Sequence, residues 1–299
     1  MAKRMLDCYA SDFREFTKED LLESVMKSEG RIIACETIGT LQPMLGNVTN
    51  AEFAAAMGAD ILLLNMFDVI DPVINGMPET KPEDTVKELK RLTGRPVGIN
   101  LEPVEEGKEG ETDPMWKMSP GRRATVDNAL RAAKMGVDMI LLTGNPGMGV
   151  SNPAIIETLK RYREAVGSEV VLAAGKMHAA GILSEAAENI MTKEDVESFV
   201  KAGADVILLP APGTVPGITV ACAHRLGAMT ITAIGTSQEG ADTDTIKRLA
   251  LMCKMTGTDI HHLGDAGYGG MSLPENIFAY STAVRGIRHT YHRMAASIE

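Results

Sequence analysis

The sequence predicts a single (βα)8 barrel of the TIM type, and three observations support that fold. A glycine closes a helix-like stretch eight times and a short apolar run follows at once, at Gly30, Gly58, Gly94, Gly136, Gly167, Gly203, Gly227 and Gly257. Successive glycines lie between 24 residues (203 to 227) and 42 residues (94 to 136) apart, which matches one strand plus one crossover helix. Four junctions are nearly identical: Gly58-Ala59-Asp60, Gly136-Val137-Asp138, Gly203-Ala204-Asp205 and Gly257-Thr258-Asp259. The 299 residues therefore fit one barrel, and we expect no second domain.

The apolar runs are the predicted strands, because their nearly continuous hydrophobicity suits parallel strands covered on both faces. The preceding glycine supplies the positive φ that ends a helix. In chain order, we expect the strands at residues 31–36, 60–65, 96–101, 138–143, 169–175, 205–210, 229–235 and 259–264. Helix start signals, each followed by an acidic residue within three positions, occur at Thr17, Thr49, Lys81-Pro82, Thr192 and Asp242.

The chain exceeds a minimal barrel at its N-terminus and in two loops. Residues 1–30 form an expected N-terminal extension whose helix closes the bottom of the barrel, and residues 31–299 form the barrel itself. The connections 102–123 after the third strand and 176–191 after the fifth are longer than usual for this architecture. Because both follow strand C-termini, they are candidate lids, with surface insertions or oligomer contacts as the alternative.

Composition and charge exclude several classes of function. The formal net charge of −10 and an isoelectric point near 5.2 argue against a nucleic-acid partner, which needs a basic surface. The sequence shows neither an apolar run of about 18 residues nor a signal peptide at its start, so we expect no membrane partner and a cytoplasmic location. Four cysteines without C-x-x-C pairing fit a reducing compartment. Helices near both ends of this acidic chain could support a homo-oligomer.

The loops after the seventh and eighth predicted strands are rich in glycine and hydroxyl side chains. Such loops bring backbone N–H groups close to an anion, and barrels often hold phosphate there. The expected phosphate cradle consists of Gly235, Thr236, Ser237, Gly267, Gly269 and Gly270. The alternative is that the glycines serve tight turning only. Asp265 and Glu239 lie in the same loops and would repel a phosphate unless they face a metal ion or a sugar hydroxyl.

Lys176 and His178 follow the fifth predicted strand, where that apolar run meets the mouth of the barrel. Desolvation there would lower the pKa of Lys176 and make it a base or an amine nucleophile. Anion binding and simple solvation are the alternatives for this lysine. His178, two residues further on, is a candidate proton shuttle.

Carboxylates end the first, second and third predicted strands. Glu36 and Glu102 could approach each other and perform acid–base chemistry or hold a divalent ion. Asp68 would complete a three-carboxylate cluster, so Asp68 and Glu102 are the candidate ligands for Mg²⁺ or Mn²⁺. No cofactor is required by the sequence.

Amides and histidines complete the strand-end residues. Asn65, Asn100 and Asn145 are placed to orient substrate hydroxyls or carbonyls. His261 and His262 are consecutive, so strand alternation points one into the barrel and one toward the helices. We expect a structural role for this pair.

The repeated Gly-Ala-Asp turns and the two glycine-rich loops resemble the phosphate-binding TIM-barrel superfamily, which includes barrels similar to thiazole synthase and inosine-monophosphate dehydrogenase. Residues 58–68 and 96–101 are also similar to the BtpA-like barrel enzymes, in a resemblance that spans roughly residues 55 to 145. That family has no settled reaction, so the resemblance implies a barrel and little chemistry.

Three functional hypotheses follow. The first is an enzyme that acts on a small phosphorylated metabolite, similar to a sugar phosphate, by proton abstraction or by lyase or isomerase chemistry at a carbon–carbon bond. The second is a divalent-metal-dependent lyase or hydrolase of the phosphoenolpyruvate-mutase type. The third is a barrel without catalysis that serves as a metabolite sensor or scaffold.

Overall fold

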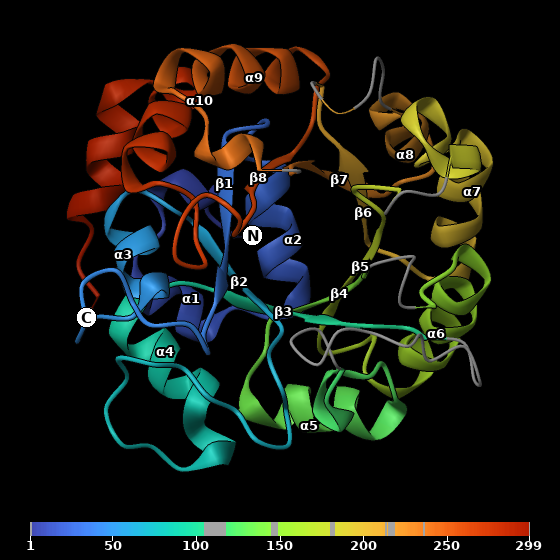
Figure 1. Ribbon diagram of the computed structural model, residues 1–299, viewed down its shortest axis with the longest axis horizontal. Helices are drawn as coiled ribbons and strands as arrows, with labels where there is room; N and C mark the ends of the chain where they lie inside the picture. The colour runs from blue at the N-terminus through green and yellow to red at the C-terminus, as the bar shows by residue number, and fades with distance from the viewer. Residues whose placement is uncertain are drawn as a thin grey trace.

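The computed structural model describes residues 2–104, 118–144, 149–179, 183–212, 214, 219–235 and 237–298. Eight parallel strands pair in chain order and close into a barrel, as predicted, and helices surround it (Figure 1). The strands are β1 Ile32–Ile38, β2 Ile61–Asn65, β3 Val97–Leu101, β4 Met139–Leu142, β5 Val171–Gly175, β6 Val206–Pro210, β7 Met229–Ile234 and β8 Ile260–Leu263. Seven of these strands lie within their predicted ranges and β1 runs two residues past its range, so the predicted (βα)8 fold is confirmed.

The helices occupy the connections between these strands. The α-helices are α1 Ala10–Glu15, α2 Lys18–Met26, α3 Asn50–Ala56, α4 Thr85–Thr93, α5 Val126–Met135, α6 Asn152–Ala165, α7 Lys193–Ala202, α8 Val220–Arg225, α9 Thr243–Met255 and α10 Pro274–Ala295. Short 3₁₀ helices are η1 Met5–Asp7, η2 Pro82–Asp84, η4 Pro120–Arg122, η6 Leu183–Glu185, η7 Ala187–Asn189 and η8 Gln238–Gly240. The predicted start signals cap α2, α3, α7 and α9, and Lys81-Pro82 opens η2 ahead of α4. None of the helices in the described ranges is long and apolar enough to cross a membrane.

Seven of the eight predicted helix-ending glycines have a positive φ, and Gly167 is the exception. The helix before it, α6, ends at Ala165 and is followed by Val166 at φ −136°. A Cβ at Gly167 would lie 2.6 Å from the Arg163 carbonyl oxygen. Close packing, and not a left-handed backbone, therefore requires the glycine at this position.

The four repeated aspartates join neighbouring strands at the N-terminal end of the barrel. Each precedes an even-numbered strand and accepts a backbone N–H from the start of the strand before it, at 2.7 to 2.9 Å: Asp60 from Ile33, Asp138 from Val97, Asp205 from Leu172 and Asp259 from Thr230. Each also contacts a basic side chain: Asp60 Arg285 and Arg293, Asp138 Lys90, Asp205 Lys18 and Arg163, and Asp259 His224. The repeated tripeptide is therefore a device for strand pairing.

The N-terminal segment closes this end of the barrel. Apolar side chains of η1, α1 and α2 pack against the inward-facing residues of the strands, and α2 projects onto the centre of the barrel in Figure 1. The Lys18 side chain is 3% exposed and lies 2.7 Å from both Asp205 Oδ2 and the Gly167 carbonyl oxygen. The bottom of the barrel is thus covered, and access to its interior must come from the other end.

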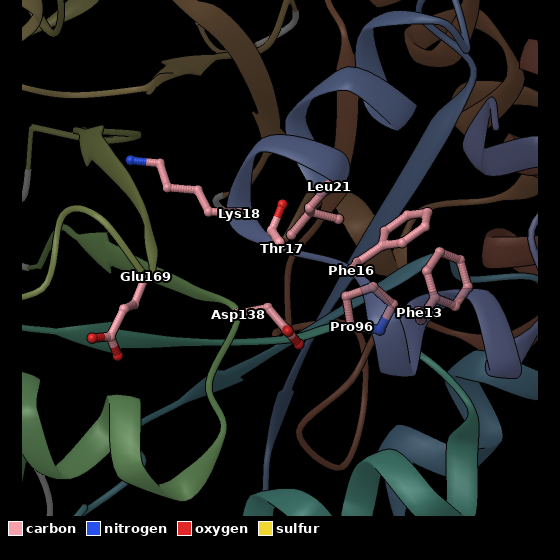
Figure 2. A pocket seen from close by; sticks show the side chains of 8 residues that line it. All are labelled: Phe13, Phe16, Thr17, Lys18, Leu21, Pro96, Asp138 and Glu169. Atoms are coloured by element: carbon pink, nitrogen blue, oxygen red, sulfur yellow. The ribbon is translucent and has the colours of Figure 1, made fainter. Parts of the chain in front are cut away.

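A small cavity of about 30 Å³ remains between the N-terminal segment and the strand starts. Figure 2 shows its lining, which is Phe13, Phe16, Thr17, Lys18, Leu21, Pro96, Asp138 and Glu169. This volume suits one or two water molecules and no metabolite.

Candidate active site

Polar side chains replace the apolar filling at the C-terminal end of the barrel interior. The interior cluster contains Ala34, Leu63 and Ile260 on β1, β2 and β8. Glu36, Asn65 and His262 follow two positions later on these strands, so their side chains face the same interior. Asn100 occupies the matching level on β3 and is 6% exposed. The mouth of the barrel is therefore lined by polar groups, two of which, Glu36 and His262, can take up and release a proton.

Hydrogen bonds connect Glu36, Asn100 and Asn65 to one another and to Asp265. Asn100 Nδ2 donates to Glu36 Oε1 at 2.5 Å and to Asn65 Oδ1 at 3.2 Å. Asn65 Nδ2 in turn donates to Asp265 Oδ2 at 2.7 Å. Two carboxylates at the barrel mouth, Glu36 and Asp265, are thus linked through two amides that come from neighbouring strands.

The two consecutive histidines have separate roles, as strand alternation predicts. His261 faces the helices, where Tyr280 Oη and the Gly30 carbonyl oxygen each lie 3.0 Å from one of its ring nitrogens. Burial lowers the pKa of His261 to about 4, so it is neutral and structural. His262 is fully buried, with Nε2 3.3 Å from Glu36 Oε2. The expectation of a structural role therefore holds for His261, whereas His262 belongs to the site.

Asp265 lies two residues after β8 in a half-buried position. The pKa of Asp265 is raised to about 7, mainly by burial and next by the negative charge of Glu36, while the hydrogen bond from Asn65 opposes the rise. His262 also opposes the rise, and Glu239 adds to it. A carboxyl group that holds its proton up to neutral pH can act as a general acid or base.

Several buried polar atoms of the mouth have no hydrogen-bond partner in the part of the chain that the structure describes. They are Asn100 Oδ1, both ring nitrogens of His262, and Glu239 Oε2. The contact between His262 and Glu36 is close but not aligned as a hydrogen bond. Because unpaired buried polar groups are costly, such a cluster fits a place that a ligand or water fills.

Lys176 and His178 follow β5 at the mouth of the barrel. Lys176 directly follows β5 and is 3% exposed, and Met177 next to it packs against the interior cluster. His178 is half-buried, and burial lowers its pKa, while the nearby charge of Glu36 opposes this effect. His178 is therefore close enough to sense Glu36, and the predicted catalytic roles of both residues stay predictions.

Glu102 has a different partner from the one the sequence suggested. Its Oε1 accepts hydrogen bonds from Arg122, including one from Nε at 3.1 Å. Burial raises the pKa of Glu102, and the charge and hydrogen bonds of Arg122 oppose the rise. The described contacts join Glu102 to Arg122, whereas Glu36 belongs to the Asn100 network.

Asp68 organises a loop. It accepts the backbone N–H groups of Ile70 at 2.7 Å, Asp71 at 3.0 Å and Gly121 at 3.3 Å. Burial raises its pKa, but Ser119 and these N–H groups outweigh burial and lower it. No group of three His, Cys, Asp or Glu residues within the described ranges is arranged to hold a metal ion. The predicted Mg²⁺ or Mn²⁺ site at Asp68 and Glu102 therefore stays a prediction.

The glycine-rich turn after β8 packs against β1. A Cβ at Gly267 would lie 2.8 Å from the Met271 carbonyl oxygen, and one at Gly270 would lie 2.8 Å from Leu41. Gly269 and Gly270 have positive φ angles of 59° and 81°, and the Gly270 carbonyl accepts the Ile38 N–H at 2.9 Å. These contacts account for the glycines as packing and turning residues.

The remaining predicted site residues are placed as follows. Gly235 follows β7 directly, and Ser237 has a positive φ of 70°. Asn145 and Thr236 lie outside the described residues, as do 105–117 and 180–182 within the two long loops. The phosphate cradle and the two lids therefore stay predictions.

The sequence pattern alone assigns no catalytic or binding role to His262, Asp265 and Glu239. Alternation already showed that one of the two histidines faces the barrel, but only the strand register identifies which one. Asp265 and Glu239 would repel a phosphate, and the position of Asp265 just after a predicted strand is itself a signal for a site residue.

The fold and this mouth define a (βα)8 barrel whose candidate active site lies at the C-terminal ends of the strands. The chain belongs to the family described as "Domain of unknown function (DUF7916)", whose model matches residues 6–299. No curated protein matches the sequence. The family match does not confirm the resemblance to BtpA-like enzymes.

Solved structures share the barrel at low sequence identity. The carboxyl transferase domain of pyruvate carboxylase from Rhizobium etli, solved with pyruvate, has a TM-score of 0.52 at 11% identity and covers 98% of this chain and 52% of that chain. 2,3-Dimethylmalate lyase, a PEP mutase/isocitrate lyase superfamily member, gives 0.49 at 13% identity, with 85% and 82% covered. Phosphonopyruvate hydrolase complexed with oxalate and Mg²⁺ gives 0.47 at 15% identity, with 90% and 85% covered. Of these, the carboxyl transferase domain shows a shared fold and nothing further.

Proposed function

We propose that this barrel is an acid–base enzyme of the lyase class that makes or breaks a carbon–carbon bond in a small hydroxy or oxo acid. The observation that carries the proposal is the chain Glu36–Asn100–Asn65–Asp265 inside the mouth, with His262 against Glu36. Two carboxyl groups with different surroundings, held on a rigid barrel, form a typical acid–base pair.

Glu36 is the base in this proposal, and Asp265 is the acid. Glu36 removes the proton of a substrate hydroxyl, the adjacent carbon–carbon bond breaks, and the hydroxyl carbon becomes a carbonyl. The electron pair of the broken bond passes to the departing enolate, which takes a proton from Asp265. Asn100 and Asn65 hold the two carboxyl groups in register, since each amide donates to one of them.

An organic acid suits this mouth better than a phosphorylated metabolite. Glu36 and Glu239 lie close enough to Asp265 for their negative charges to raise its pKa. The same two charges would repel a phosphate dianion. A substrate carboxylate carries one negative charge and is therefore repelled less than a phosphate dianion. Lys176, buried at the end of β5, remains the candidate cation for the substrate anion.

The test is thermal unfolding of the purified protein with small hydroxy and oxo acids, sugar phosphates, inorganic phosphate, Mg²⁺ and Mn²⁺, alone and in pairs. A ligand at about one hundred times its Kd adds roughly 2.7 kcal/mol to the free energy of unfolding. Glu36→Gln removes the proposed base, and Glu275→Gln is the matched control because Glu275 is exposed on α10. Compounds that stabilise the protein are then incubated with it, and products are followed by proton NMR.

Stabilisation by an organic acid, with turnover that Glu36→Gln abolishes and Glu275→Gln retains, supports the proposal. Stabilisation by sugar phosphates alone would instead support the phosphorylated substrate. Stabilisation by a divalent ion alone would support the metal-dependent hypothesis. Binding without turnover, unchanged in the double variant Glu36→Gln with Lys176→Ala, would support a sensor or scaffold.

A further inference from the structure

Glu239 is a buried carboxylate with no role in the steps above. It lies in η8 after β7 and is 2% exposed. Its backbone carbonyl accepts hydrogen bonds from Asn276 Nδ2 at 2.9 Å and from Ser272 Oγ at 3.3 Å. Both donors belong to the segment that begins α10, so the main chain of Glu239 is fixed from the far side of the β8 loop.

The Glu239 carboxylate contacts the backbone on both sides of Asp265. Its Oε1 accepts the N–H of Ala266 at 2.9 Å. A Cβ at Gly264 would lie 2.7 Å from the same oxygen and 3.3 Å from Glu239 Cδ, so a larger residue there would displace the carboxylate. The Glu239 carboxylate therefore lies against the peptide segment that carries Asp265.

We propose that Glu239 is a positioning residue for Asp265: its carboxylate, which accepts the Ala266 N–H and lies against Gly264, fixes the direction of the Asp265 side chain. The inference rests on the proposed acid role of Asp265. The second oxygen, Oε2, has no hydrogen-bond partner in the described part of the chain. The Ala266 N–H is therefore the one described donor to this carboxylate. Burial and Glu36 are the larger causes of the raised pKa of Asp265, and Glu239 adds to them.

The experiment is a carbon-13 NMR titration of protein labelled at the aspartate carboxyl carbons, with the Asp265 signal assigned by its loss in Asp265→Asn. Glu239→Gln keeps an oxygen that can accept from Ala266 and removes only the charge. We expect the midpoint of Asp265 to fall in this variant, by less than about one pH unit, because Glu239 is a smaller cause of the raised pKa than burial and Glu36. Glu275→Gln, which removes an exposed charge on the adjacent α10, should leave the midpoint unchanged.

Gly264→Ala provides a second and independent variant. It keeps the charge of Glu239 and pushes the carboxylate away from Ala266, so the Asp265 midpoint should move while the net charge stays the same. If Glu239→Gln does not fold, this variant decides. An Asp265 midpoint equal to that of the wild type, in whichever of the two variants folds, overturns the proposal.

The titration needs no substrate, so its outcome is separate from that of the ligand panel. A shifted midpoint with no turnover on any organic acid would keep the role of Glu239 and reject the proposed reaction. An unshifted midpoint together with turnover of an organic acid would reject the role of Glu239 and keep the proposed reaction.

Discussion

The two ends of the barrel surround their carboxyl groups in opposite ways. At the N-terminal end, each of the four repeated aspartates accepts a backbone N–H and contacts a basic side chain. At the C-terminal end, Glu36, Asp265 and Glu239 share one region, and amides and backbone groups are their described hydrogen-bond partners. The first arrangement places a basic side chain beside each acidic group, whereas the second brings several acidic groups together.

The first arrangement therefore serves stability, and we expect the second to serve function. A carboxylate with a matched cation and donors contributes to the fold, and its loss leaves a buried charge without a partner. A cluster of like charges costs folding energy, and such costs concentrate at sites where a ligand or a proton transfer requires them. Substitutions at the bottom should therefore unfold the protein, and substitutions at the top should impair chemistry while leaving the fold intact.

The largest effect is expected at Asp60. This residue is fully buried and contacts Arg285 Nη1 at 2.5 Å and Arg293 Nε at 2.7 Å. A third arginine, Arg95, is close enough to Asp60 to sense its charge, and burial lowers the pKa of Arg95 to about 9. Asp60→Asn should lower the free energy of unfolding by about 3–5 kcal/mol, measured by urea denaturation.

Asp84→Asn is the control for Asp60→Asn, because Asp84 pairs with Lys87 at 3.4 Å on the surface. We expect no measurable change in that variant. Equal losses in both variants would mean that burial of the ion pair is not what matters at the bottom of the barrel.

The next effect concerns activity at Glu36. Glu36→Gln keeps the shape of the side chain and removes the proposed base, so turnover of a substrate from the panel should fall about 10²- to 10⁴-fold. The free energy of unfolding should stay within about 1 kcal/mol of the wild type, because like charge at the mouth is reduced. Steady-state kinetics and urea denaturation on the same sample measure both. A variant that unfolds while its remaining folded fraction retains full turnover would contradict the division between the two ends.

The fold was predictable because its signals are local. A buried parallel strand needs a continuous apolar run, and Thr17, Thr49, Thr192 and Asp242 cap helices within three or four residues of themselves. Gly167 shows the limit of such reasoning. Its constraint comes from the Arg163 backbone, not from its own φ angle.

The site was predictable only as a set of strand ends. Glu36, Asn65 and Asn100 could be placed at the mouth, since a parallel barrel gathers the C-terminal ends of its strands. Which of them touch depends on register and on loops of distant sequence. Glu102 pairs with Arg122 across a connection that the strand pattern does not describe, and Glu239 reaches Ala266 from another loop.

A smaller effect is expected from the pH dependence of Asp265. The folded protein keeps this proton up to about pH 7, whereas the unfolded chain loses it near pH 4. Between these values the unfolded state binds fewer protons, so stability falls as pH rises, and the full penalty is present above about pH 7. Asp265→Asn should remove a slope of at most about 1.4 kcal/mol per pH unit, measured by urea denaturation from about pH 5 to pH 8. Asp244→Asn, at an exposed position in α9, should retain the wild-type slope.

The smallest effect is expected at His224, which contacts the fourth repeated aspartate. His224 Nε2 lies 2.8 Å from Asp259 Oδ2, but the histidine side chain is 41% exposed. Asp259 also accepts the N–H and the hydroxyl of Thr230 at 2.7 and 2.9 Å, so it keeps two donors when the histidine is removed. His224→Ala should therefore cost less than about 1 kcal/mol, and the cost should decline further in high salt. A loss as large as that of Asp60→Asn would show that the basic partner itself, and not its burial, makes the bottom of the barrel stable.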